Sequence, residues 1–157
     1  METSQDTVKV KGFFHLQIAD PDGDIVGDSG ICTNVITNEG KRNYLARLLG
    51  AIASSSQIGY AALGTGSAPA TDATTLPSEL GEAVRNAVAA ATSGSTAVVF
   101  TGTFASASSF VTATRALSNI GLFATDTGGT LFAGATYTSS SCGTNQNVNY
   151  TYTITFT

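Results

Sequence analysis

The stretch NVNYTYTITFT, residues 147–157, alternates between apolar and polar side chains along its whole length. Its apolar side consists of Val148, Tyr150, Tyr152, Ile154 and Phe156. A period of two residues is typical of a β-strand with one face in a core and the other toward solvent. We therefore expect this stretch to be paired with other strands inside a sheet.

A similar pattern, VKVKGFFHLQIA, occupies residues 8–19. Its core face would be formed by Val8, Val10, Phe14, Leu16 and Ile18. Phe13 and His15 fall on the opposite face, together with lysine and glutamine. The turn sequence DPDGD follows, and IVGDSGICTNVIT then returns as a second strand, which predicts an N-terminal hairpin over residues 8–36.

Only TNEGKRNYLARLLGAI, residues 37–52, shows a convincing helical pattern. Thr37 or Asn38 can cap it. One apolar stripe would be formed by Tyr44, Leu45, Leu48, Leu49 and Ile52. We predict a short helix over about 38–50 that packs on the sheet through this stripe.

The remaining segments again favour strands. GYAAL at 59–63 reads as a short buried strand, and TAVVFTGTFA at 96–105 and NIGLFATDTGGTLFAGATYT at 119–138 are rich in β-forming residues. Gly128 and Gly129 suit a hairpin turn. The predicted fold is mainly β: a single domain over 1–157, an antiparallel β-sandwich or jelly-roll-like fold with one short α-helix.

Charged residues make up 11% of the 157 residues, against about 25% in ordinary soluble domains. We interpret this as a subunit with much of its surface covered, and the other interpretation is a free β protein kept soluble by hydroxyls. The net charge of −4 argues against direct binding of nucleic acid, which needs clustered Lys and Arg.

No stretch has the pattern of a signal peptide or the length of a membrane span, so we expect no membrane partner and synthesis in a cytoplasm. Cys32 and Cys142 show no metal-ligand spacing. The expected state is two reduced, buried thiols, and a disulfide between them is the alternative.

The stretch ALGTGSAPATDATTLPSELGEAVR, residues 62–85, has two glycines around a threonine, as phosphate-binding loops do. No lysine follows to contact a phosphate, and Pro69 stands where a dinucleotide fingerprint needs its third glycine. We therefore predict no cofactor here. Gly64 and Gly66 would let the chain turn sharply out of a strand, and Pro69 and Pro77 would stiffen an extended loop over 64–80.

Catalytic and metal motifs are incomplete. Asp20, Asp22 and Asp24 have calcium-loop spacing, but Ile25 and Ile31 replace the required glycine and glutamate, so a solvated turn is the favoured interpretation and we predict no metal. The single histidine, His15, has no triad pattern around it, which favours a structural or interface role.

Two acidic and two basic residues can form pairs. Glu79 and Glu82 suit a cap or a solvated turn, and Arg85 and Arg115 can each pair with a carboxylate of this chain or of a neighbouring subunit. No convergent acid and base pair is evident, so we expect a protein that is not an enzyme.

Three stretches in this order resemble small virion structural proteins of tailed bacteriophages, often head decoration (cement) proteins and sometimes tail proteins. They are the hairpin and helix of residues 11–49, the Gly-Thr-Gly loop of residues 61–85 and SNIGLFATDTGGTLFAGATY of residues 118–137. The resemblance implies a non-enzymatic protein, typically a homotrimer, on the outer capsid surface of the virion. There it would bind the major capsid protein and stabilise the shell.

On this interpretation the loop over 64–80 is an arm that lies over a neighbour. The candidate interface residues are Phe13, His15, Gly64, Gly66, Pro69, Asp72, Pro77, Glu79 and Arg85. The strand tips near 106–109 are a further candidate region.

Two alternatives remain open. The first is a tail or tail-fibre-associated subunit. The second is a carbohydrate-binding module that uses Tyr60, Phe110, Tyr137 and Tyr150, although the chain has no tryptophan and core packing explains these aromatics better.

Overall fold

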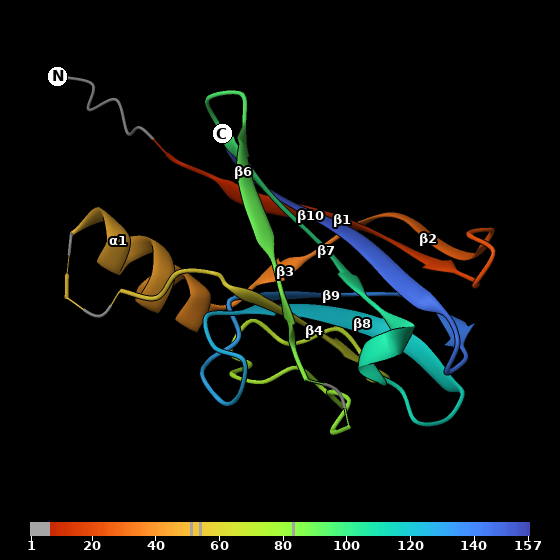
Figure 1. Cartoon of the computed structure of the whole chain (residues 1–157). Helices are drawn as coiled ribbons and strands as arrows, with labels where there is room; N and C mark the ends of the chain where they lie inside the picture. Colours follow the sequence, from red (N-terminus) through yellow and green to blue (C-terminus); the bar gives the residue numbers. More distant parts are fainter. Residues whose placement is uncertain (1–6, 51, 54, 83) are drawn as a thin grey trace, which may run out of the picture.

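The computed structural model describes residues 7–157 apart from 51, 54 and 83, and it contains two five-stranded antiparallel sheets stacked face to face (Figure 1). Sheet A consists, in spatial order, of β2 (Ile25–Thr33), β1 (Val10–Ala19), β10 (Asn147–Phe156), β7 (Ala97–Phe104) and β6 (Ala89–Ser93). Sheet B consists of β3 (Val35–Ile36), β9 (Ala133–Cys142), β8 (Arg115–Phe123), β4 (Tyr60–Gly64) and β5 (Asn86–Ala87). The mainly β sandwich with one short helix is confirmed.

Strands β1 and β10 form the centre of sheet A, where the two ends of the chain pair in register from Val10 opposite Phe156 to Ala19 opposite Asn147. Their alternating apolar residues point between the sheets, as the sequence predicts. Tyr152 and Ile18 are completely buried there. The core between the sheets therefore depends directly on contacts between the first and last strands.

The second half of the expected N-terminal hairpin divides at Asn34. Strand β2 pairs with β1, whereas β3 crosses to the other layer and pairs with β9. The Asn34 amide donates a hydrogen bond of 2.7 Å to the hydroxyl of Tyr152. Gly12 makes room for this crossing, since a Cβ at Gly12 would lie 2.4 Å from the Asn34 side chain.

The predicted helix spans 38–49, with a π-helical part η1 (Gly40–Ala46) followed by α1 (Arg47–Leu49). Thr37 caps it, because the Thr37 hydroxyl accepts a hydrogen bond of 2.9 Å from the N–H of Gly40. The expected apolar stripe is only half correct. Tyr44 is buried against the sandwich, but Leu48 and Leu49 are 55% and 90% exposed.

The direction of the helix accounts for this difference. The helix extends beyond the edge of the two sheets (Figure 1). Its second half consequently has no sheet beneath it.

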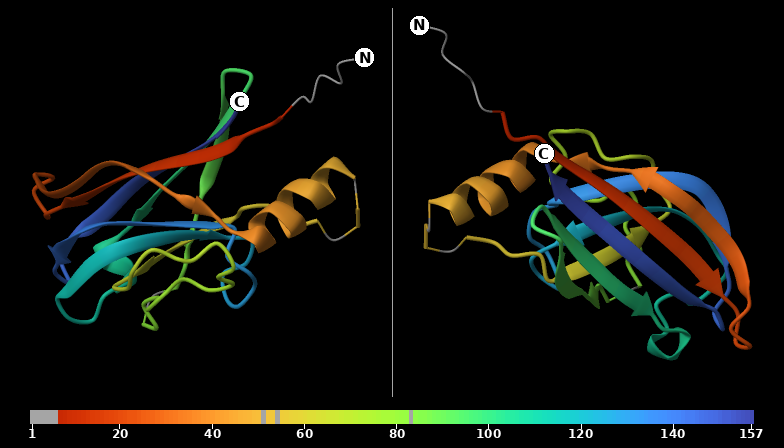
Figure 2. Two further views of the ribbon diagram at one scale, coloured as in Figure 1. Left: turned by 180° about the vertical axis from the view of Figure 1, so that it is seen from behind. Right: turned by 90° about the horizontal axis from the view of Figure 1, so that it is seen from above.

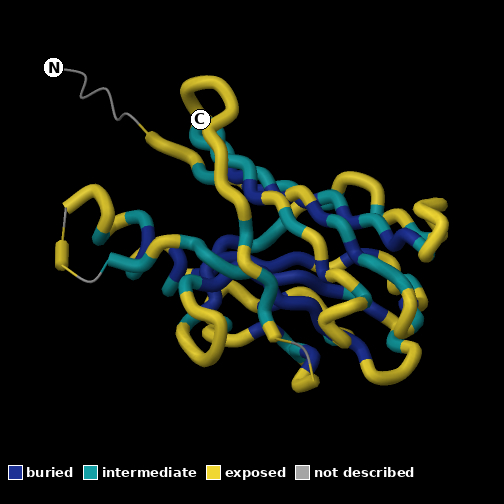
Figure 3. The backbone as a smooth tube through the Cα atoms, viewed as in Figure 1, coloured by how far each residue is buried: buried dark blue, intermediate teal, exposed yellow. Residues whose placement is uncertain are grey.

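The segment between β4 and β5 forms a partial third layer outside sheet B. Leu76 is buried there with Ala62, Phe123 and Leu131. Pro69 lies directly on sheet B, where a Cβ on Gly134 would approach its ring to 2.7 Å. The expected extended loop over 64–80 is thus folded against its own chain. Figure 3 shows that the strands of sheet B, which this loop covers, consist largely of buried residues.

Strands β8 and β9 are joined at the predicted glycine turn. Gly128 and Gly129 have φ angles of 59° and 69°, which glycine adopts readily. This turn lies beside the loop over 64–80, and the Leu131 N–H donates to the carbonyl of Thr74 at 2.8 Å.

Candidate functional site

The outer face of sheet A carries two rows of side chains that cross all five strands. The pairing register places Ile31, His15, Thr151, Thr101 and Ala89 in one row. The adjacent row contains Thr33, Phe13, Thr153, Val99 and Ala91. In the right panel of Figure 2 strands β2, β1, β10 and β7 lie open to the viewer. We call these two rows the sheet A face.

The sheet A face combines hydroxyl groups with exposed apolar surface. Ile31 is 80% exposed, and Phe13 is half-buried beside it in a shallow hollow of about 440 Å³. His15 is the one ionisable residue in the two rows. Threonine hydroxyls and methyls cost less to dehydrate than charged groups, so a face of this kind suits contact with another protein surface.

His15 belongs to a hydrogen-bonded cluster at one side of this face. The His15 Nε2 atom lies 2.7 Å from Oδ1 of Asp28, and the Gln17 amide donates to Oδ2 of Asp28 at 2.8 Å. The N–H of Gly30 also donates to Asp28, at 2.7 Å. These bonds fix the orientation of the imidazole, so His15 presents a defined edge to a partner.

The cluster stabilises the ionised form of Asp28. Hydrogen bonds from the Gln17 side chain, the Gly30 N–H and the His15 ring lower the pKa of Asp28 from 3.8 to about 2. Asp28 is therefore ionised at every pH near neutrality. Among the residues that the structure describes, no serine or cysteine is hydrogen-bonded to His15.

The other predicted interface residues lie on the opposite side of the molecule, in or next to the loop over 64–80. Gly64 and Gly66 do not have positive φ angles; they allow close contact. A Cβ at Gly66 would lie 2.3 Å from the carbonyl oxygen of Pro77. The chain does bend at Thr65 and Gly66, directly after β4, and these close contacts add a steric reason for glycine at both positions.

The buried amide of Asn119 holds the two ends of this loop together. Its Nδ2 donates to the carbonyl oxygens of Ser67 and Pro77, at 3.0 Å and 2.8 Å. The Ser118 hydroxyl donates to the carbonyl of Gly66 at 2.8 Å. Sequence reasoning missed Asn119, and its only signal is a polar residue within an apolar strand.

Glu79 and Arg85 form a bidentate ion pair within the chain. Arg85 Nε donates to Oε1 of Glu79 at 2.7 Å, and Arg85 Nη2 donates to Oε2 of Glu79 at 3.0 Å. Arg85 also donates to the carbonyls of Thr125 and Gly128, and its guanidinium carbon lies 3.4 Å from the centre of the Phe123 ring. These contacts attach the end of the loop to the β8–β9 turn.

The second expected ion pair is also made within the chain. Arg115 Nη2 lies 2.6 Å from Oε1 of Glu82. Each arginine therefore pairs with a carboxylate of its own chain, which was one of the two possibilities. Asp72 and its neighbour Thr71 are exposed on the outer side of the loop.

The predicted interface residues thus form two groups on opposite faces. Phe13 and His15 belong to the sheet A face, whereas the loop residues cover sheet B. The sandwich separates the groups, so one flat partner surface does not reach both. The tip at 106–109 is a third exposed region, where Ser109 has a φ of 53°.

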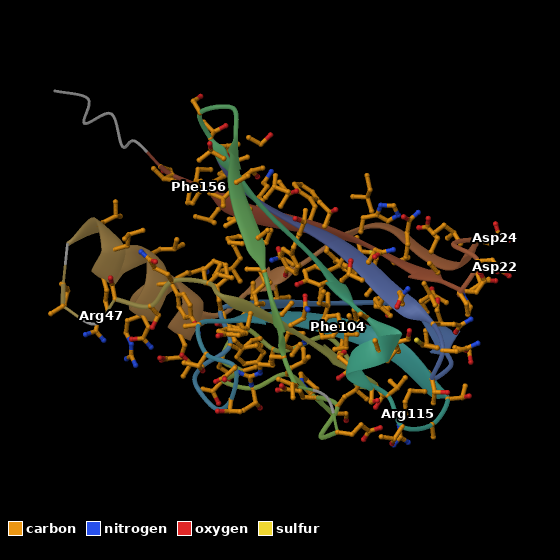
Figure 4. The ribbon with its side chains drawn as sticks, viewed as in Figure 1. Asp22, Asp24, Arg47, Phe104, Arg115 and Phe156 are labelled. Atoms are coloured by element: carbon orange, nitrogen blue, oxygen red, sulfur yellow. The ribbon has the colours of Figure 1, made fainter. Side chains whose placement is uncertain are left out.

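The acidic turn between β1 and β2 is stabilised by its own backbone. Asp20 Oδ1 accepts a hydrogen bond of 3.2 Å from the N–H of Asp24. Figure 4 shows Asp22 and Asp24 at the tip of this hairpin, far from the helix. Within residues 7–157, less the three positions left out, no group of three or more His, Cys, Asp or Glu could hold a metal ion.

Both cysteines are free thiols, as expected. Cys142 is completely buried, and burial raises its pKa to about 11. Cys32 is only half-buried, so the expectation of two buried thiols holds for one of them.

Most of the aromatic residues considered for sugar binding are in the core. Phe110, Tyr137 and Tyr150 are 2%, 7% and 3% exposed, and Tyr60 is half-buried. A buried ring cannot stack on a sugar, so the core interpretation of these three aromatics is confirmed.

Comparison with protein-family models, with curated proteins and with solved structures gives no match. None of the helical segments in the described part of the chain has the length and apolar character that crossing a membrane requires.

Proposed function

We propose that this chain is a structural protein of a tailed-phage virion, a decoration protein that binds the major capsid protein shell through the sheet A face. The observation that carries the proposal is the difference between the two outer faces of the sandwich. The chain covers much of sheet B with its own loop, whereas the ten-residue strands β1 and β10 leave their outer side open.

The chemistry of the face supports a protein partner. Its rows hold threonines, two alanines and the apolar residues Phe13, Ile31 and Val99, with His15 fixed by Asp28. A flat surface with few charges loses little on dehydration and excludes water well once it is covered. The three stretches that resemble decoration proteins are consistent with this role.

Repetition explains how such a surface can stabilise a shell. Each copy contributes a modest contact, and a symmetric shell offers the same site many times. A copy, or a pair of copies, can touch two neighbouring shell subunits. Once the first contact has formed, the second is intramolecular, and its high effective concentration strengthens the overall binding. The bridged subunits then separate less readily on heating.

The test uses the purified chain and shells of the cognate major capsid protein that lack it. We expect saturable binding at a fixed number of copies per shell, with a higher melting temperature of the loaded shells. Binding to isolated tails and not to shells would instead support the tail-associated alternative and contradict the decoration role.

A matched pair of variants tests the face itself. Thr151→Glu places a charge in the centre of the sheet A face, and Thr138→Glu places the same charge on the exposed side of sheet B. We expect the first variant to weaken shell binding at least about tenfold, equal to about 1.4 kcal/mol, and the second to bind normally. Equal binding by both variants would show that the shell contacts another surface.

A further inference from the structure

The four edges of the two sheets differ in how well they are protected against pairing with another strand. Open edges expose unpaired backbone N–H and C=O groups, and natural proteins protect them with bulges, charges or short length. Strands β3 and β5, at the edges of sheet B, have only two residues each. Strand β2 has register shifts and carries Asp28.

Strand β6 lacks all three protections. Its five residues pair in unbroken register with β7, from Ala89 opposite Thr101 to Ser93 opposite Ala97. All five are exposed, and no described strand pairs with the outer side of β6. Figure 1 shows the β6–β7 hairpin rising from the sandwich with this side free. The edge is therefore able to accept one more strand.

An apolar groove lies directly beside this edge, between the hairpin and the helix. It has a volume of about 270 Å³, and no charged residue lines it. Its lining includes Leu45, Leu48, Ala90, Val98, Phe100 and Phe156. Two further exposed apolar residues follow Leu48: Leu49 ends the helix, and Ile52 lies just beyond it. A strand added to β6 would place alternate side chains over the groove.

The absence of charged residues along this edge favours a second copy of this chain as the partner. The sequence between Arg85 and Arg115 contains no Asp, Glu, Lys, Arg or His, and this stretch includes β5, β6 and β7. The chain has a net charge of −4, so two copies repel each other where their acidic regions meet. The β6 edge lets two copies approach without placing like charges opposite each other.

The edge carries no charge, so backbone groups and small side chains alone select the strand that pairs with it. An antiparallel pair of identical strands satisfies both edges with one set of hydrogen bonds about a two-fold axis. We propose that β6 pairs with β6 of a second copy of this chain and joins the two A sheets into one continuous sheet.

This pairing gives a dimer, whereas the resemblance to decoration proteins implies a homotrimer. A two-fold contact uses the β6 edge of both copies completely, so it closes at two and cannot add a third. The inference concerns the chain alone and does not depend on binding to a shell.

The first experiment is sedimentation equilibrium of the full chain over a wide concentration range. We expect a reversible monomer–dimer equilibrium. Ala90→Lys introduces a charge at the groove and Ala91→Lys introduces one on the adjacent outer side of the edge, and each should raise the dimer Kd at least about tenfold. Val26→Lys puts the same charge on exposed β2 and should leave the Kd unchanged.

Thermal unfolding of each variant shows whether the monomer remains folded. A monomeric chain at all concentrations overturns the proposal, as does a trimer. A dimer whose Kd does not respond to Ala90→Lys or Ala91→Lys also overturns it.

Single cysteines at each position from 89 to 93 test the symmetry of the contact, in a Cys32→Ser background that retains the buried Cys142. Two identical antiparallel strands bring a residue close to its own copy only near the two-fold axis. We expect oxidative cross-links between copies at one or two adjacent positions. Cross-links at none of the five positions, or at all of them equally, would contradict two-fold pairing of β6.

Discussion

Two buried tyrosines, Tyr152 and Tyr137, differ in the fate of their hydroxyl groups. The Tyr152 hydroxyl accepts a hydrogen bond from Asn34, whereas the Tyr137 hydroxyl has no hydrogen-bond partner in the described part of the chain. Burial raises the pKa of both phenols above the ordinary value of 10, so both stay protonated near neutrality. The two hydroxyls therefore contribute to stability with opposite sign.

We expect Tyr152→Phe to lower the free energy of unfolding by about 1–3 kcal/mol, because it leaves the amide of the half-buried Asn34 without its acceptor. Tyr137→Phe removes a polar group that is dehydrated without compensation, so it should be neutral or stabilising. Urea unfolding of both variants measures the difference. Equal destabilisation would mean that the Tyr137 hydroxyl has a partner in solution.

Asp28 makes stability depend on pH in the acid range. Its pKa is about 2 in the folded chain and near its ordinary value of 3.8 when unfolded, so the unfolded chain takes up a proton first as pH falls. The stabilisation is complete above about pH 5 and is lost as pH falls toward 2.

We expect Asp28→Asn to flatten the change in the urea midpoint between pH 5 and pH 2, while a titration of the wild-type carboxyl signal by NMR gives a midpoint near 2. Asp22→Asn, at the exposed tip of the same hairpin, serves as the control and should leave the slope as in the wild type. An unchanged slope in Asp28→Asn would show that the cluster around His15 does not form in solution.

At the scale of elements, the loop over 64–80 is held by close backbone contacts that only small residues permit. Gly66→Ala would place a Cβ 2.3 Å from the carbonyl oxygen of Pro77, so the loop must move. We expect a loss of about 1–3 kcal/mol, in the range of overpacked sites. Gly81→Ala is the matched control, because nothing lies within 4 Å of its Cβ position.

Hydrogen exchange locates the effect of the Gly66 substitution. The N–H groups of Thr65 and Leu80 donate across the base of the loop, at 3.1 Å and 2.9 Å, and should exchange faster in Gly66→Ala. Normal protection in that variant would contradict the close approach of Gly66 to Pro77.

The sequence predicts those elements whose pattern is local. The alternation in β1 and β10, the Thr37 cap and the Gly128–Gly129 turn all follow from neighbouring residues, and all are confirmed. The exposed end of the helix could not be predicted in this way. Whether Leu49 is covered depends on how far the sheets extend beneath the helix, and no local period carries that information.

The candidate site shows the same division. Phe13 and His15 are assigned to a strand face by alternation alone, and the structure places both on the sheet A face. The pairing of β6 with β7, and the absence of a described strand on its other side, arise from contacts between distant segments. The one local signal for this edge is the uncharged run after Arg85, which a periodicity argument does not use.

At the scale of the whole molecule, the first and last strands pair in the centre of sheet A, so segments at opposite ends of the sequence pack together in the core. Sheet A is complete only when both ends of the chain are in place, and it forms one wall of the shared core, so we expect the core to open as one unit. Cys142 reports on this, since it lies in β9 with its thiol completely buried between the sheets.

With excess iodoacetamide at pH 8, we expect one fast adduct, at half-buried Cys32, and slow reaction of Cys142. Two causes act together on Cys142: its pKa of about 11 leaves little thiolate, and its sulfur is reached only when the sandwich opens. Mass spectrometry of a Cys32→Ser variant follows the second reaction alone. Its rate should rise with urea with the slope of global unfolding, because exposure of the thiol requires separation of the sheets. A shallow urea dependence would mean that the Cys142 end of β9 opens locally, which its pairing with Arg115 of β8 opposes.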